Sequence, residues 1–497
     1  MTSGEDISTS LHAAARGGRA DGRRRAGLAV SGRRVVAVGV GKAARGTIRR
    51  LGRGNGTALP GKAALAIDGR LLAGLAAEIG RGAVIVTGTN GKGTTCRMLA
   101  AMMDAAGLHP ILNHEGSNQP TGLVTTLLSR ATPVGRLPAG DRAIGVFEVD
   151  EGSLPEILPQ VRPEVLVLTN IFRDQMDRYL DLGYLTRRWE QSLRALPADT
   201  TLVVNADDPR LAHLAADLDN PRVSYGLGDV AHRRAGTDHT SDCPRCPRCA
   251  GELRYHCVFY AHLGHWECRD CGLARPAPQV YAEKIDLVGP ESSRLQIALP
   301  ASEAVLEVPA PGLYNAYNAV AAAAAATACQ LPGTALPAVG QARTGCFRME
   351  RVTTGGRHAH LALAKNPSGY TEVLRALLGD GQPKHMLLAL DDWAGNQQPD
   401  VSWIWDVDFE SLRGRVPAAV LSGNRAADLA VRLKYAGWTG DGPTDIAVEP
   451  DPVRAFRLAL ARTPAAQPLC VVSTQLAAWQ LRDWLHRQGD VGALWER

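Results

Sequence analysis

Residues 83–95 read Ala-Val-Ile-Val-Thr-Gly-Thr-Asn-Gly-Lys-Gly-Thr-Thr, an apolar segment that runs into a glycine-rich turn with a single lysine. In a strand–turn–helix setting, glycines let backbone N–H groups close around phosphate oxygens, and the following helix directs its positive end toward them. Lys92 is placed to reach the outer phosphates of a nucleotide triphosphate, and Thr94 or Thr95 to face a magnesium ion. The predicted nucleotide-binding residues are Gly88, Thr89, Asn90, Gly91, Lys92, Gly93, Thr94 and Thr95.

This turn is a variant of the generic phosphate loop. The generic pattern has a glycine where this chain has Val86, and a hydroxyl residue directly after the lysine, where this chain has Gly93. A glycine turn that binds no ligand is the competing interpretation, because short motifs also match by chance.

The composition is that of a soluble α/β protein with several domains. The chain has 497 residues, of which 45% are hydrophobic, enough for a large core and roughly three domains. No apolar segment reaches the ~18 residues that cross a bilayer, and no signal peptide is evident, so we expect a cytoplasmic protein. Net charge is +5, but residues 1–53 hold twelve Arg and Lys against three acidic residues. This basic arm is either a solvated tail or a contact for anionic lipid or nucleic acid.

Four cysteines have the spacing of a zinc site. Cys246 and Cys249 form one Cys-x-x-Cys pair, and Cys268 and Cys271 form another, with eighteen residues between the pairs. Four thiolates fill a tetrahedron and leave no open position, so the predicted metal is structural Zn²⁺. Disulfides are the competing interpretation, and the nearby residues that rank second as ligands are Cys243, Cys257, His262 and His265.

Short apolar runs alternate with helical patterns from about residue 60, which predicts a parallel sheet covered on both faces. The predicted strands are 83–87, 143–149, 165–169 and 201–204. Polar residues follow these strands, and the carboxyl ends of parallel strands meet at one edge of a sheet. Glu148, near one of these ends, is therefore a predicted magnesium ligand beside the lysine turn.

A second, Rossmann-like α/β unit is predicted after residue 345. Its candidate strands are 386–390, 418–421, 445–448 and 469–472. The predicted organisation is a basic, partly flexible arm over 1–54, a central ATP-binding domain over 55–340 with a zinc-ribbon insertion at 240–275, and a C-terminal domain over 345–497.

Taken in order, five motifs resemble those of the Mur ligase family. They are Gly88-Thr-Asn-Gly-Lys92, the acidic strand end at Glu148, Asn170-Ile-Phe-Arg-Asp174-Gln-Met-Asp177, Asn205-Ala-Asp-Asp-Pro209 and Gly312-Leu-Tyr-Asn-Ala-Tyr-Asn318. The first four also suit a folylpolyglutamate synthetase. The cysteine segment and four later motifs resemble the branch of the family that amidates lipid II, namely Lys365-Asn-Pro-Ser-Gly369, Asp400-Val-Ser-Trp-Ile-Trp-Asp406, Ser422-Gly-Asn-Arg425 and Arg432-Leu-Lys-Tyr-Ala-Gly437.

This resemblance implies a Mur ligase fold and an ATP- and Mg²⁺-dependent ligase. The enzyme would activate the α-carboxylate of D-glutamate in the lipid II stem peptide and amidate it to D-isoglutamine with ammonia. Carried over by position, Glu148 would hold magnesium, Asn318 the adenine side of ATP, and Arg348 the phosphates across the domain interface.

The resemblance also implies a partner, a separate GatD-like glutaminase that supplies the ammonia and forms a heterodimer with this chain. Asp400 would complete the partner's Cys-His-Asp triad, with Asp406 as the second candidate. The neighbouring Trp403 and Trp405 are either interface anchors or core residues. The lipid-borne substrate implies work at the inner face of the plasma membrane.

Two departures and two alternatives accompany the resemblance. Gln175 stands where many Mur ligases have histidine, and Cys346-Phe-Arg348 replaces a Phe-Gly-Arg turn. One alternative is a stand-alone Mur ligase or folylpolyglutamate synthetase-like enzyme that adds an amino acid. The other is a zinc-ribbon ATPase that binds nucleic acid, suggested by arginines near the cysteines but lacking an aromatic platform for single strands.

Overall fold

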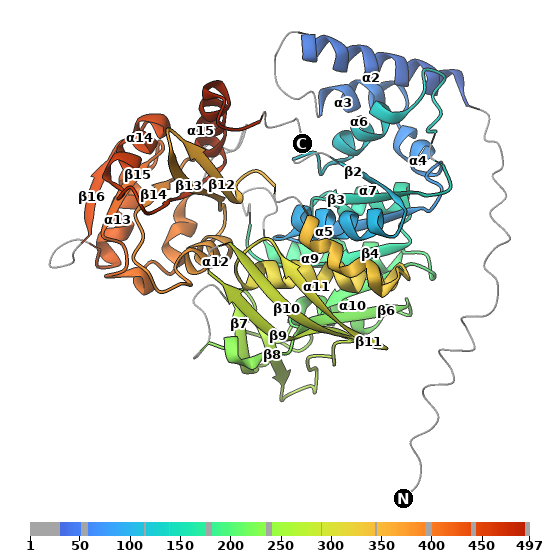
Figure 1. Ribbon diagram of the computed structural model, residues 1–497. Helices are drawn as coiled ribbons and strands as arrows, with labels where there is room; N and C mark the ends of the chain where they lie inside the picture. The colour runs from blue at the N-terminus through green and yellow to red at the C-terminus, as the bar shows by residue number, and fades with distance from the viewer. Residues whose placement is uncertain are drawn as a thin grey trace, which may run out of the picture.

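The computed structural model describes residues 30–50, 58–113, 116–138, 140–174, 181–234, 241–289, 291–342, 345–392, 400–438 and 444–492. These residues form a nine-stranded sheet, a six-stranded sheet and a two-stranded hairpin. The nine-stranded sheet and its helices make up most of the larger body, and the six-stranded sheet forms a second body beside it (Figure 1). The predicted α/β class with parallel sheets is confirmed.

The nine-stranded sheet has the order β11-β10-β9-β6-β5-β4-β1-β3-β2. Strands β1 to β6 and β9 run parallel to one another, and β10 and β11 add an antiparallel edge. The strands are β1 (Ala83–Thr87), β2 (His109–Leu112), β3 (Ala143–Val149), β4 (Val165–Leu168), β5 (Thr201–Asn205), β6 (Arg222–Leu227), β9 (Val280–Val288), β10 (Ser292–Leu299) and β11 (Ser302–Val308).

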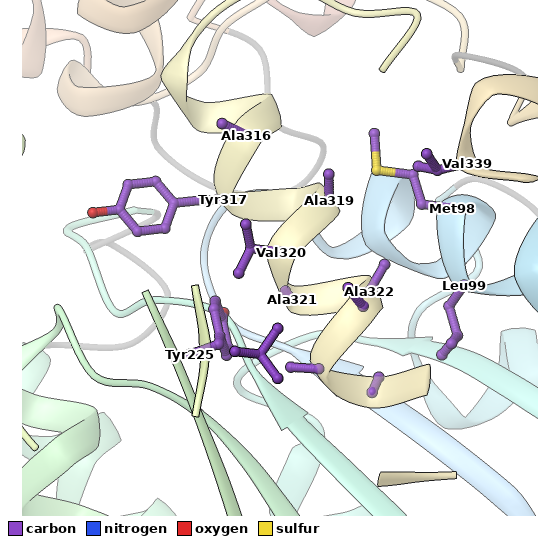
Figure 2. Close-up of a cluster of buried hydrophobic side chains, with 14 of the residues drawn as sticks. Met98, Leu99, Tyr225, Ala316, Tyr317, Ala319, Val320, Ala321, Ala322 and Val339 are labelled. Atoms are coloured by element: carbon purple, nitrogen blue, oxygen red, sulfur yellow. The ribbon is translucent and has the colours of Figure 1, made fainter. Parts of the chain in front are cut away.

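Side chains of β1 alternate between two cores, one on each face of the sheet. Val84 and Val86 face the first core, whereas Ala83 and Ile85 face the second. Helices α5 (Lys92–Ala105) and α11 (Leu313–Ala328) cover the first face. Figure 2 shows the alanines of α11 beside Met98 and Leu99 of α5, with Tyr225 of β6 below. The small alanine side chains let α11 lie close to both α5 and the sheet.

The second face is covered by helices from before and after the phosphate turn. They are α2 (Gly32–Arg50), α3 (Leu59–Ile67), α4 (Leu71–Ala76), α6 (Pro120–Arg130), α7 (Leu154–Val161), α9 (Leu182–Arg194) and α10 (Pro209–Ala216). Helix α2 lies outermost, over α3 and α6 (Figure 1). Residues 32–50 of the predicted basic arm therefore form a helix whose Ala37 and Val38 are buried. Residues 1–29 and the predicted boundary near residue 54 lie outside the described residues.

The C-terminal sheet has the order β12-β13-β17-β14-β15-β16. Its strands are β12 (Arg348–Thr354), β13 (Arg357–Leu363), β14 (Met386–Ala389), β15 (Ala418–Ser422), β16 (Asp445–Val448) and β17 (Leu469–Ser473). Helices α12 (Pro367–Leu377), α13 (Ala426–Tyr435), α14 (Pro452–Arg462) and α15 (Gln475–Gln488) accompany them, and a core lies on each face. All four predicted strands are present, and the β12–β13 pair is an addition that the sequence did not indicate.

The remaining elements are short. The cysteine segment contains the hairpin of β7 (Leu253–Tyr260) and β8 (Leu263–Cys268). Four 3₁₀ turns complete the described chain, namely η2 (Val230–His232), η3 (Gly333–Gln341), η4 (Ser402–Asp406) and η5 (Glu410–Leu412).

Two glycines, one in α3 and one in α2, test how closely the helices on the second face of the nine-stranded sheet pack. A Cβ on Gly61 of α3 would lie 1.9 Å from the carbonyl oxygen of Thr121 in α6, whereas a Cβ on Gly46 of α2 would meet nothing within 4 Å. We expect Gly61→Ala to lower the free energy of unfolding by about 1–3 kcal/mol through overpacking. Gly46→Ala should raise it by roughly 0.5–1 kcal/mol, because alanine is the better helix former. Urea denaturation followed by circular dichroism measures both, and shifts of the same sign would contradict the packing.

Candidate active site and metal centre

The turn after β1 requires glycine at two positions. Gly88 and Gly91 have positive φ angles of 133° and 88°. A Cβ on Gly91 would lie 2.0 Å from Oδ1 of Asn318, and one on Gly88 would lie 2.2 Å from Oγ1 of Thr169. Helix α5 then begins at Lys92, with Gly91 as an N-cap that offers no side chain. The backbone N–H groups of this helix start are therefore available to an anion.

Lys92 is folded over its own loop. Its ammonium Nζ donates to the carbonyl oxygens of Gly88 at 2.5 Å and Thr89 at 2.9 Å, and it pairs with Oε2 of Glu151 at 2.9 Å. Glu151 is buried, and this burial raises the pKa of its carboxyl, opposed by the Lys92 cation. The Lys92 cation is therefore held against three oxygens at the glycine turn.

A second lysine–carboxylate pair lies beside the first and joins the two domains. Nζ of Lys365, which follows β13, is 2.8 Å from Oδ2 of Asp174, which follows β4. Burial disfavours the Lys365 cation, yet the charges of Asp174 and Glu151 raise its pKa above the ordinary value. The sequence indicated these residues only as parts of motifs or as polar residues after strands, and it did not predict that they pair. The only local indication of a shared site was that they follow the carboxyl ends of strands in a parallel sheet.

The predicted magnesium ligands lie at the start of α5. Glu148 in β3 is so close that a Cβ on Gly93 would lie 2.6 Å from its Oε2. The hydroxyl of Thr95 is buried and has no hydrogen-bond partner among the described residues. Thr94, the alternative ligand, precedes it in the chain and is one position nearer to Lys92. A half-buried carboxylate and an unsatisfied buried hydroxyl are oxygen donors of the kind that Mg²⁺ takes, so this part of the site fits the ion.

Asn318 and Arg348 occupy different positions relative to the loop. Asn318 lies on α11 directly against Gly91, where it donates from Nδ2 to Oδ1 of Asn315 at 3.1 Å. Arg348 begins β12 and is exposed. Burial raises the pKa of the Tyr314 phenol on α11, and the Arg348 cation opposes that rise, so Arg348 lies near the amino end of α11. The structure thus places Asn318 at the loop and Arg348 at the domain boundary.

The four predicted zinc ligands come together. Their sulfur atoms all lie within 4.8 Å of one another, with Sγ–Sγ distances of 3.6 Å for Cys246–Cys271 and 3.5 Å for Cys249–Cys268. Tetrahedral Zn–S bonds of ~2.3 Å place sulfurs about 3.8 Å apart, so the cluster fits zinc. All ten cysteines are free of disulfides.

The residues ranked second as ligands are occupied elsewhere. Nε2 of His262 lies 3.4 Å from Oδ2 of Asp208, and both side chains are fully buried. Nε2 of His265 lies 2.9 Å from the carbonyl oxygen of Leu227. Cys243 and Cys257 lie outside the cluster of four cysteines whose sulfur atoms come within 4.8 Å of one another.

The hairpin that the cysteines anchor reaches the phosphate loop. At its tip, the hydroxyl of Tyr260 accepts a hydrogen bond from Nδ2 of Asn90 at 3.1 Å. Nδ2 of Asn366, from the C-terminal domain, donates to Oδ1 of the same Asn90 at 3.1 Å. Asn170 completes the junction by accepting from the backbone N–H of Asn90 at 2.8 Å. One loop side chain therefore links three parts of the molecule.

Two family models match the chain. The Mur ligase middle domain matches residues 86–245, and the MurT ligase C-terminal model matches residues 363–474. The MurT subunit of lipid II isoglutaminyl synthase (glutamine-hydrolyzing) from Staphylococcus aureus is 31% identical over 415 residues, which cover 81% of this chain and 88% of that protein. The chain belongs to the MurT family.

Another MurT relative and a solved structure agree. The MurT subunit from Streptococcus pneumoniae is 32% identical over 412 residues, covering 82% of this chain and 87% of that protein. A pseudomurein peptide ligase type C from Methanothermus fervidus superposes with a TM-score of 0.62 at 20% identity, covering 82% of this chain and 79% of that one, which shows the fold. As a MurT family member with a Mur ligase fold, the chain is an ATP-dependent ligase.

In this MurT chain the two candidate aspartates differ in their surroundings. Asp400 is exposed before η4, where its Oδ1 accepts the backbone N–H of Ser402 at 2.8 Å. Asp406 instead pairs at 3.1 Å with Arg173 of the central domain. The two tryptophans also differ, because Trp403 packs against Tyr370 in the core while Trp405 is 50% exposed. Gln175 and Asp177 lie outside the described residues.

The cysteine cluster predicts a pattern of zinc retention in this protein. Cys246→Ser and Cys268→Ser should each lose most of the bound zinc, since each removes one thiolate of the cluster. Cys243→Ser should keep it, because that buried thiol lies outside the cluster. Elemental mass spectrometry of protein dialysed against a chelator measures the zinc, and loss in Cys243→Ser would contradict the ligand set.

The junction at Asn90 predicts a role for one hydroxyl of the zinc hairpin. Tyr260→Phe should raise the KM for ATP about fivefold, since a lost hydrogen bond of ~1 kcal/mol frees the Asn90 side chain. Tyr255→Phe is the matched control, because it loses a bond of 3.1 Å to the Cys243 carbonyl within the same hairpin. Steady-state kinetics and zinc content are measured for both variants. Equal rises in KM for both variants would show that Tyr260→Phe acts by destabilising the hairpin in general and not through Asn90.

Proposed function

We propose that this chain is the synthetase subunit of a lipid II isoglutaminyl synthase. It uses ATP to activate the α-carboxylate of D-glutamate in lipid II, and it forms D-isoglutamine with ammonia from a separate, GatD-like glutaminase. Membership of the MurT family supports the substrate and the reaction. The single observation that carries the proposal is the meeting of Lys92 and Lys365, one from each domain, beside the phosphate loop.

The two lysines suit phosphoryl transfer to a carboxylate. A carboxylate is a poor electrophile, and transfer of the γ-phosphoryl group of ATP converts it into an acyl phosphate whose phosphate departs when ammonia attacks. Lys92 and Lys365 would neutralise the charge of the moving phosphoryl group, and each would exchange its carboxylate partner for phosphate oxygens. Glu148, with Thr94 or Thr95, would hold Mg²⁺, which withdraws electron density from the phosphates.

The loop and α11 would bind the remainder of the nucleotide. Backbone N–H groups from Gly88 to Thr95 would surround the phosphates, and Asn318 beside Gly91 would hold the adenine side. Arg348 would approach the phosphates from the C-terminal domain. The Asn90–Asn366 contact supports this arrangement, because it keeps the C-terminal domain against the loop.

Ammonia would come from the partner, because Cys96, Cys329 and Cys470 are poor nucleophiles. Burial raises the pKa of the Cys96 thiol above its ordinary value, and it raises the pKa values of Cys329 and Cys470 to about 12. The exposed Asp400 would orient the histidine of the partner's triad and stabilise its imidazolium form. Exposed Trp405 lies on η4, which follows Asp400 in the chain, and would belong to this interface.

Nitrogen-source dependence tests the proposal. Asp400→Asn should reduce glutamine-driven amidation of lipid II by at least about 100-fold, since losing the third triad member impairs the histidine base. Activity with ammonium chloride should be unchanged, and Asp406→Asn should retain both activities. Lys92→Ala should abolish both, because phosphoryl transfer precedes either route.

The assay uses the purified chain with and without the glutaminase, and mass spectrometry identifies the product. Amidation with glutamine by the chain alone would overturn the partner. A product that gains the mass of an amino acid would indicate a stand-alone ligase instead. Equal loss of both activities in Asp400→Asn would place Asp400 in the ligase site.

A further inference from the structure

Four helices at the amino-terminal end of the described structure carry charged residues of one sign only. Helices α2, α3, α4 and α6 carry eight Lys and Arg residues, six on α2, one on α3 and one on α6, and not one Asp or Glu. The whole chain has 55 basic and 50 acidic residues, so the excess of positive charge is concentrated here. A surface of this sign attracts anionic surfaces.

The outward side of α2 is apolar between its cations. Exposed positions recur with helical spacing along one face, which we call the α2 face, and consist of Arg33, Val36, Val40, Ala43, Thr47 and Arg50. Among the α2 cations whose side chains the structure describes, Arg34 is buried and pairs with Glu78 at 2.8 Å. The guanidinium of Arg33 donates to the carbonyl oxygen of Ile67, a neutral group that leaves its charge uncompensated.

Further apolar side chains are exposed around α2. Val36, Val40, Leu59 at the start of α3 and Val134 after α6 are between 41% and 62% exposed. Val134 adjoins Gly135, which lies near Val30 at the start of α2. A groove of about 200 Å³ also runs beside the helix, lined by Lys42, Arg45, Pro60, Thr125, Leu128 and Ser129. Exposed valines with flanking cations are typical of helices that lie in a bilayer interface.

We infer that the α2 face docks on an anionic phospholipid bilayer. None of the described helices is both long and apolar enough to cross a membrane. The contact is therefore peripheral, with the valines at the level of the head groups and the cations on lipid phosphates. This inference rests on the proposed function only in that a lipid-borne substrate gives the docking a purpose.

The position of the surface suits that purpose. Helix α6 connects the two regions, since its N-cap Gln119 follows Asn118, whose side chain lies 3.5 Å from Oε1 of Glu148. Near its other end, Leu128 of α6 lies against Gly41 of α2. An α-helix of 11 residues is roughly 16 Å long, so the bilayer surface would lie about one such helix from the active site.

Vesicle co-sedimentation of the full chain tests the docking. The probes are vesicles of phosphatidylglycerol with phosphatidylcholine, and vesicles of phosphatidylcholine alone. We expect binding to the anionic vesicles only, weakened by 0.5 M salt. Arg33→Gln/Lys42→Gln/Arg50→Gln should reduce it on the order of 100-fold, at roughly fivefold for each cation. Val36→Ser/Val40→Ser should reduce it severalfold.

The matched control removes three exposed cations from another surface. Lys284→Gln/Arg294→Gln/Arg351→Gln lies on β9, β10 and β12 and should leave vesicle binding unchanged. Binding that is absent, equal on neutral vesicles, or insensitive to the α2 variant overturns the inference. Loss of the glutaminase in copurification of the α2 variant, with vesicle binding retained, would make the surface a protein interface and overturn it as well.

The vesicles contain no substrate, so their result is independent of catalysis. The α2 triple variant should retain ammonium-driven amidation of detergent-solubilised lipid II, which also shows that it folds. Failure of the wild-type chain in that amidation assay would reject the proposed function while leaving the vesicle result as it stands.

Discussion

Two lysine–carboxylate pairs at the junction of the domains are the constraint on which the rest of the site depends. Lys92, Glu151 and Asp174 are buried, and removing a charged group from water costs several kcal/mol, so the pairs are not explained by stability alone. Lys92 and Lys365 share this junction with Glu151 and Asp174, two pairs that fix the positions of both cations. A triphosphate is the ligand that best matches two such cations beside a glycine loop, because its oxygens can take over both pairings.

The second organising feature is the hairpin that the cysteine cluster anchors. It has little core of its own, and Trp266 fixes it to the central domain by donating from Nε1 to the carbonyl oxygen of Ala206 at 3.2 Å. A metal that closes such a segment contributes its binding energy to the order of the segment. Since the tip of the hairpin bears Tyr260, that order extends to Asn90 and so to the loop and the C-terminal domain. A metal at the cysteine cluster would thereby be connected to the glycine turn after β1 through Tyr260 and Asn90.

We propose that three surfaces divide the work of a synthetase subunit. The residues where the two domains meet would bind the nucleotide, and the segment with Asp400 and the exposed Trp405 would face a partner. The α2 face would carry its cations and exposed valines toward a bilayer. Small residues allow the helices to pack closely on the central sheet. Gly41, Gly61 and the alanines of α11 let helices approach closely enough to cover both faces of the sheet.

The sequence by itself determined the features that depend on local chemistry. Glycines beside a lysine after an apolar strand, paired cysteines at fixed spacing, and alternating strands and helices each have one common structural solution, and all three are present. Tertiary structure alone decided which distant residues meet. The tip hydroxyl that bonds Asn90 lies 170 residues away, and Lys365 and Asp174 belong to different domains. It also decided that residues 32–50 pack as a helix, that Trp403 packs against the core while Trp405 is exposed, and that Asp406 pairs with Arg173 of the central domain. Burial and long-range pairing are properties of the packed chain, so no pattern of neighbouring residues encodes them.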